Sequence, residues 1–214
     1  MKMRILALFA LANITFFLAV SSAYSDVATL TDNTGSLQVS SPFVSNSTWQ
    51  AQGFTTTGLE YRLTDVALLL SNSTHSTGTF ALSIYTIASN TSPVWVADIR
   101  TGIDASTIGN GSGGYARYDV LGISISLSPS TPYFLVAKGT NLSANIQWGA
   151  AALITPSLHK KNTSGTWTDI TTNPLIMSVK ASEPLAVATP EPSTYLLLCI
   201  SLGAVGIVRR KMDN

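Results

Sequence analysis

Two histidines, His75 and His159, are the side chains of this sequence best suited to acid–base catalysis. Both stand in stretches that read as polar loops. In a serine hydrolase a histidine takes the proton of a nucleophilic hydroxyl, and the partners can lie far apart along the chain. The sequence contains no Gly-x-Ser-x-Gly turn of the kind that exposes such a serine. We therefore expect both histidines to be solvated.

A glycine-rich segment has the spacing of a dinucleotide-binding loop. Gly109, Gly111 and Gly114 fit the pattern Gly-x-Gly-x-x-Gly. In a nucleotide site this pattern follows a strand and opens a helix, whose N-terminus holds the phosphates. Residues 115–120 read instead as another strand, so we predict a loop without a cofactor.

Carboxylates provide the remaining route to catalysis. A glycoside hydrolase needs two of them, and Asp98, Asp104 and Asp119 are the main candidates. Each stands in a turn or at a strand end, where solvation or capping accounts for it. No Asp-x-Asp pair or histidine cluster predicts a metal site. We predict that the protein is not an enzyme, and a secreted hydrolase is the least favoured alternative.

Aromatic side chains could bind sugars by stacking. Trp167 follows a turn-rich stretch and is the best candidate for exposure, with Trp148 as a second stacking residue. The alternative is that the aromatics fill the core, as is usual for a tryptophan in a strand. The other aromatics considered for such a face are Trp49, Trp95, Tyr115, Tyr118 and Tyr133.

Composition and periodicity define the elements that must position these residues. Short period-2 runs, rich in serine and threonine and separated by turn formers, predict an all-β fold, an antiparallel β-sandwich or jelly roll. In residues 79–87, Phe80, Leu82 and Ile84 share one face, and Ala81, Ser83 and Tyr85 share a face that we expect in water. The predicted strands are 62–70, 79–87, 93–100, 122–127, 132–138, 146–150 and 175–181.

The charge of the predicted domain excludes some partners. Residues 24–189 carry seven basic and nine acidic side chains, a net charge of −2. No basic patch is visible, so nucleic-acid binding has no support. The single cysteine, Cys199, lies in the C-terminal apolar run. The domain therefore has no disulfide and depends on a hydrophobic core.

The N-terminal residues 1–23 have the three parts of a secretory signal peptide. Lys2 and Arg4 precede an apolar run, and small residues lead to Ala23, the predicted signal-peptidase site. Cleavage by signal peptidase would release the domain outside the inner membrane.

The C-terminal residues have the composition of a membrane anchor. A small-residue linker, 182–189, leads to Pro190, Glu191 and Pro192. Residues 194–208 follow as a predicted transmembrane helix, although fifteen apolar residues are fewer than the about twenty of a usual span. The basic residues after it would remain in the cytoplasm by the positive-inside rule; they are Arg209, Arg210 and Lys211.

Residues 190–214 contain the Pro-Glu-Pro triplet, the apolar span and the basic end in this order. This arrangement resembles the PEP-CTERM sorting signal of Gram-negative bacteria. The resemblance implies that a membrane transpeptidase-like enzyme, exosortase, recognises and cuts the tail. It also implies a link to exopolysaccharide and biofilm. The protein would then be anchored in the inner membrane transiently and finally reach the cell surface or the extracellular matrix.

The domain at residues 27–181 is similar to the choice-of-anchor R domain, a β-rich module found before different anchoring tails. The matching segments are 50–56, 61–66 and 127–136. This family brings no catalytic residue to carry over. The sequence thus predicts a non-catalytic surface or matrix protein, and a carbohydrate-binding module with a defined glycan site is the alternative.

Overall fold

The structure is a computed structural model that describes residues 27–36, 38–40, 42–87, 92–109, 114–152, 159–170 and 173–183. These residues belong to one compact unit, Asp26–Pro184. The predictions for the signal peptide and Ala23, for most of the linker, and for the sorting tail with its transmembrane helix lie outside the described residues. Within the described residues, no helix is long and apolar enough to cross a membrane.

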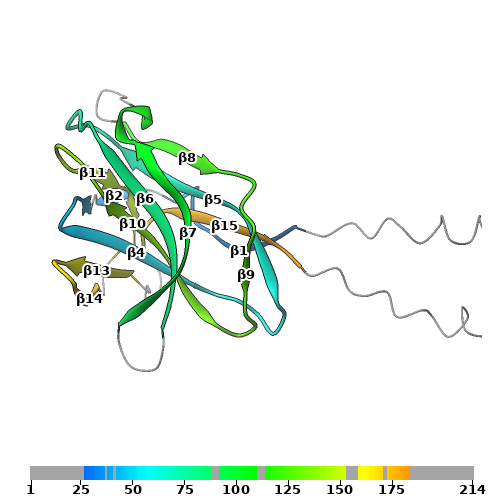
Figure 1. Cartoon of the computed structure of the whole chain (residues 1–214). Coiled ribbons are helices and arrows are strands. Elements are labelled where there is room, and N and C mark those ends of the chain that lie inside the picture. The colour runs from blue at the N-terminus through cyan, green and yellow to red at the C-terminus, as the bar shows by residue number, and fades with distance from the viewer. Residues whose placement is uncertain are drawn as a thin grey trace, which may run out of the picture. The chain divides into compact units, whose positions relative to one another are not determined.

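The first sheet has seven strands, and β5 lies at its centre. Its path runs β1-β15-β5-β11-β3, and β8 and β9 also pair with β5. The last strand, β15, therefore lies between β1 and β5 (Figure 1). The bounds are β1 Val27–Asp32, β3 Phe43–Val44, β5 Tyr61–Ser71, β8 Ala116–Val120, β9 Ile125–Leu127, β11 Ile146–Trp148 and β15 Met177–Ser182.

The second sheet has six strands in the order β14-β13-β4-β10-β6-β7, and all its pairings are antiparallel. A small third sheet pairs β2 with β12, and a 3-10 turn, η1, follows β7. The bounds are β4 Thr48–Thr55, β6 Thr79–Ile87, β7 Pro93–Asp104, β10 Pro132–Gly139, β13 His159–Thr163 and β14 Thr166–Ile170 for the six-stranded sheet, and β2 Gln38–Ser40, β12 Ala150–Ala151 and η1 Ala105–Thr107 for the rest.

The two large sheets pack face to face, which confirms the predicted antiparallel sandwich. Their facing sides form one hydrophobic core, because apolar residues alternate along each strand and point to the same side. Its fully buried side chains come from both sheets and include Leu63, Leu68, Leu70, Phe80, Leu82, Ile84, Leu127, Leu135, Ile146 and Trp148.

Strand β6 departs from the predicted pattern on its second face. Ala81, Ser83 and Tyr85 were expected in water, yet their exposed fractions are 0%, 0% and 7%. Tyr85 belongs to a second hydrophobic cluster on the outer side of the sheet, and the hydroxyl of Ser83 donates to Asp98 on the same side. The expectation is wrong because the outer face of the six-stranded sheet is itself covered by large side chains.

Candidate functional site

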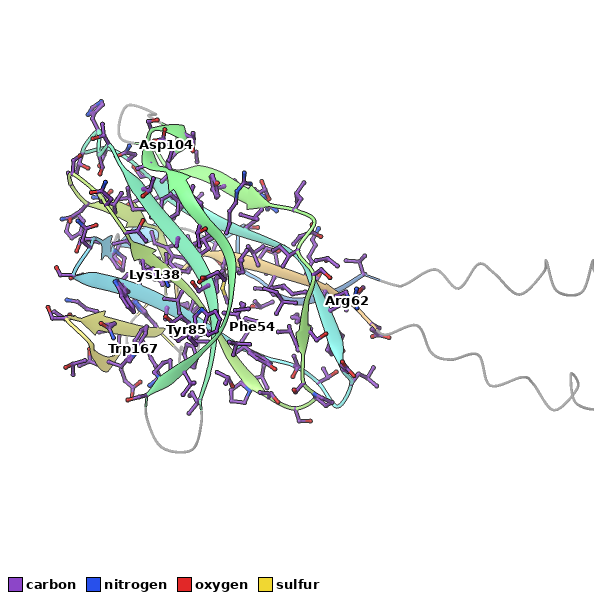
Figure 2. The ribbon with its side chains drawn as sticks, viewed as in Figure 1. Phe54, Arg62, Tyr85, Asp104, Lys138 and Trp167 are labelled. Carbon is purple, nitrogen blue, oxygen red and sulfur yellow. The ribbon has the colours of Figure 1, made fainter. Side chains whose placement is uncertain are left out.

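The outer face of the six-stranded sheet carries the second cluster, which is rich in aromatics. Phe134 is completely buried there, and Trp49 and Trp167 pack against the cluster partly buried. The ring of Trp167 meets that of Trp49 edge-on at 6.3 Å between centroids, and that of Tyr85 at 6.0 Å. Tyr85 and Trp167 lie in the same part of this sheet in Figure 2. Trp167 is thus a packing residue as much as a surface one.

Trp95, rather than Trp167, is the tryptophan of this face with an open ring. It lies on β7 opposite Tyr85 of β6, and 54% of its surface is exposed. Its indole Nε1 donates a hydrogen bond to Oδ1 of Asp98 at 3.2 Å. An exposed ring that is held in one orientation loses little entropy when a ligand stacks on it.

Asp98 connects Trp95 to the polar side chains of the same face. Its Oδ1 also accepts from Ser83 Oγ at 2.6 Å and lies 3.7 Å from Lys138 Nζ. The hydroxyl of Ser83, with smaller contributions from Trp95 and Lys138, holds the pKa of the Asp98 carboxyl below its ordinary value. Lys138 Nζ lies 5.8 Å from the ring centroid of Trp49. The face therefore combines rings with fixed, charged hydrogen-bonding groups.

The prediction that Trp148 stacks on a glycan is wrong. Its side chain is 0% exposed. Its indole Nε1 donates to the carbonyl of Ile176 at 2.8 Å. Strand β11 pairs with β5 and turns this ring into the core between the sheets, so it reaches no ligand.

The predicted candidates for catalysis are not brought together as a constellation. His75 is exposed in a turn, and the glycines Gly109 and Gly114 precede β8 rather than a helix. Asp104 caps η1 by accepting from Ser106 N at 2.8 Å, and this bond lowers the pKa of its carboxyl. Among the described residues, no group of three or more potential metal ligands is present.

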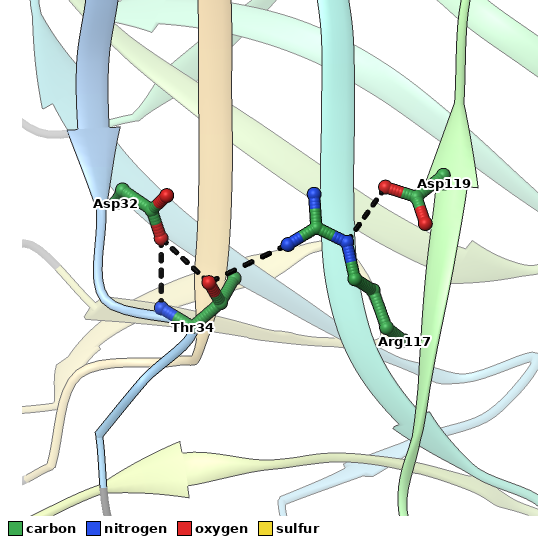
Figure 3. Close-up of polar contacts among 4 residues, drawn as sticks. All are labelled: Asp32, Thr34, Arg117 and Asp119. Atoms are coloured by element: carbon green, nitrogen blue, oxygen red, sulfur yellow. Dashed lines mark hydrogen bonds and ion pairs between the residues drawn. The ribbon is translucent and has the colours of Figure 1, made fainter.

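Asp119 takes part in a charged row on the outer face of the seven-stranded sheet (Figure 3). Arg117 Nε binds Asp119 Oδ1 at 2.8 Å, and Arg117 Nη1 reaches Thr34 Oγ1 at 3.5 Å. Thr34 donates to Asp32 Oδ1 through its backbone N–H and its hydroxyl, and these bonds lower the pKa of Asp32. The Arg117–Asp119 pair is well exposed, so it stabilises the fold little.

His159 was predicted in a polar loop, and that prediction is wrong. It lies on β13 with 3% of its surface exposed. Its Nε2 donates to Oε1 of Gln50 at 2.9 Å. Sequence reasoning missed it because β13 and β14 consist mostly of polar residues without apolar alternation. The available signal was the turn at residues 162–165, which joins these two strands as a hairpin.

The buried His159 lies at a cleft of about 350 Å³. The neighbouring strands β4 and β13 each contribute two side chains to this cleft, Thr48 and Gln50 from β4 and His159 and Lys161 from β13. The two residues of each strand are two positions apart, so their side chains point to the same face of the sheet. The complete lining is Pro42, Phe43, Ser45, Thr48, Gln50, Asn145, His159, Lys161 and Ile170.

Comparison with known proteins identifies the C-terminal tail. Residues 188–211 match the family described as the PEP-CTERM protein-sorting motif. The predicted sorting motif is thereby confirmed. It implies that the protein is exported and sorted by an exosortase. None of the curated proteins matches the sequence.

Among solved structures, the chain is similar to the clostridial cysteine protease Cwp84 after propeptide cleavage, with a TM-score of 0.53. The two sequences are 14% identical, and the match covers 77% of this chain and 42% of the protease chain. Structures of infectious bursal disease virus, strains Gt and Gx, give TM-scores of 0.32 and 0.30. Their identities are 15% and 12%, over 78% and 75% of this chain and 38% and 36% of theirs. This chain spans less than half the length of each, and the first likeness concerns the fold alone.

Proposed function

We propose that the protein is a non-catalytic component of the cell surface or extracellular matrix, delivered by exosortase and associated with exopolysaccharide. The observation that carries this proposal is the sorting motif at residues 188–211. The domain before it is a β-sandwich, and its resemblance to the choice-of-anchor R domain remains a prediction. A weakly charged exterior rich in hydroxyl groups suits hydrogen bonding within a hydrated polysaccharide.

Structural roles of the candidate side chains support the absence of catalysis. His159 is 3% exposed, and its Nε2–H donates a hydrogen bond to the amide oxygen of Gln50. Asp104 caps a turn, and Asp119 pairs with Arg117. Each of these contacts accounts for its residue without a reaction.

The sorting proposal is tested at the C-terminus of the protein from its native host. Mass spectrometry should find a mature end near Pro190–Glu191–Pro192. Replacing these three residues by alanine should leave the tail attached, whereas Pro184→Ala in the linker should not affect processing. A native protein that still ends at Asn214 would overturn exosortase processing.

A carbohydrate-binding module is the second candidate, and the geometry at Trp95 favours it. An exposed ring beside Asp98 and Lys138 offers stacking together with directed hydrogen bonds. On a glycan array, Trp95→Ala should abolish binding that Val94→Ala retains. Val94 is a matched control because it is the next residue of the same strand and 48% exposed. Binding that survives Trp95→Ala would exclude this face.

A further inference from the structure

We infer that the cleft between β4, β13 and the β3–β4 turn binds an acidic saccharide, with Lys161 pairing to the carboxylate of a uronic acid unit. This assignment rests on the proposed function, because it needs a protein that meets polysaccharide outside the cell. The site is separate from the Trp95 face: the cleft side chains Gln50, His159 and Lys161 alternate with those of the second cluster along β4 and β13.

The cleft has the size and rigidity of a binding site. Its volume of about 350 Å³ lies at the lower end of the range for small-molecule sites, about 300–1,000 Å³, and suits a short saccharide segment. Gln50 and His159 form a buried wall, each 3% exposed. Gln50 Oε1 accepts from His159, and its Nε2 donates to the carbonyl of Phe43 at 2.9 Å. The wall is therefore ordered before a ligand enters.

The charge of the cleft selects an anion. Lys161 lies directly opposite Gln50 in the β4–β13 register and is partly exposed. The ion pairs among the described residues use Arg117, Lys138 and Lys160, and none of them uses Lys161. No carboxylate is present among the described residues that line the cleft. A carboxylate ligand thus meets an ammonium group and no like charge, which favours a charge-assisted hydrogen bond.

The remaining lining matches the other parts of a sugar. The hydroxyl of Thr48 and the side-chain amide of Asn145 make no hydrogen bond to another described residue, so they are available for sugar hydroxyls. Phe43, 48% exposed, offers an apolar surface to the C–H face of the ring. Hydrolysis of the glycan would need two carboxylates. The cleft therefore binds the saccharide without cutting it.

The test is isothermal titration of the exported protein, purified in mild detergent, with hexagalacturonate and with its fully methyl-esterified form. We expect the acidic oligomer to bind at least fivefold more tightly, and 0.5 M NaCl to remove this difference by screening. Lys161→Gln should weaken binding of the acidic oligomer at least fivefold and leave the ester unchanged. Phe43→Ala should weaken binding of both.

Lys180→Gln is the matched control, because it removes the same charge from the outer face of the seven-stranded sheet and should bind as the wild type does. Equal affinity for both oligomers, unaffected by Lys161→Gln, would overturn the acidic specificity. Absence of binding to either oligomer at millimolar concentration would overturn the site itself. Neither result bears on C-terminal processing, which tests the proposed function separately.

Discussion

The junction between Gly78 and the loop at Asn141 is the position where the smallest substitution should do most damage. Gly78 has φ +91°, and a Cβ added there would lie 1.7 Å from the carbonyl oxygen of Asn141. That oxygen accepts from Thr79 N, while Thr79 O accepts from the backbone N–H groups of Thr140 and Asn141. Gly78→Ala must separate these two segments, because the obstructing atom belongs to the backbone and cannot rotate away.

A second glycine, Gly165, allows the energetic cost of this clash to be distinguished from the cost of backbone strain. Gly165, in the β13–β14 turn, has φ +94° and nothing within 4 Å of an added Cβ. Gly165→Ala should therefore show the cost of positive φ alone, about 1–2 kcal/mol. Gly78→Ala adds the loss of three backbone hydrogen bonds at about 1 kcal/mol each, about 4–5 kcal/mol in all.

The assay is thermal unfolding of both variants, followed by circular dichroism. For a domain of this size, about 1 kcal/mol corresponds to roughly 2–4 °C in Tm. We expect Tm to fall by roughly 2–8 °C for Gly165→Ala and by roughly 8–20 °C for Gly78→Ala. Equal losses in the two variants would refute the reasoning, since the two φ values are nearly the same and only the neighbours of the added methyl group differ.

Three further predictions concern the tryptophans and the response to acid. Trp148→Phe removes the indole hydrogen bond to the carbonyl of Ile176, which then keeps only the bond from Leu69 N, and it opens space in the core, so urea unfolding should show a loss of about 2–4 kcal/mol; a loss below about 1 kcal/mol would contradict this. The pKa of Asp98 is lowered in the folded state, so its stabilising contribution is present above pH about 4 and is lost as the pH falls further. Asp98→Asn should therefore reduce the drop in Tm between pH 5 and pH 3. An unchanged drop would show that Asp98 does not contribute. Trp167→Ala should destabilise the fold by about 2–3 kcal/mol because it removes the ring contacts with Trp49 and Tyr85. Trp95→Ala should cost about 1 kcal/mol or less because that ring is exposed. The reverse order in urea unfolding would contradict the packing described for this face.

Alternation along single strands was sufficient to predict the sandwich. Residues 79–87 were predicted as a strand and form β6 over the same bounds. Residues 122–127 were predicted as one strand, but the strand comprises only Ile125–Leu127; Gly122 before it adopts φ +71°, and Ile123 makes a separate backbone hydrogen bond to Thr64. Local pattern thus determines where a strand runs but not where its pairing begins.

Burial on the second face of a sheet was not predictable from the same pattern. The residues that cover β6 from outside include Trp167, which comes from a hairpin of polar composition more than eighty positions later in the sequence. The same hairpin buries His159 against Gln50, although two lysines follow it along the chain. Contacts between strands so distant in sequence depend on register, which a single sequence does not reveal.

The place of β15 between β1 and β5 has a mechanical consequence. The C-terminal segment leaves the domain from the end of β15, where Ser182 pairs with Val27 of β1 and Arg62 of β5. Tension on that segment acts along a strand whose hydrogen bonds run perpendicular to the pull on both edges. The bonds on both edges are then loaded in shear, all together, whereas a pull across the strands would open them one after another. A domain held by its C-terminus in flowing or contracting surroundings would therefore resist extension at its point of attachment.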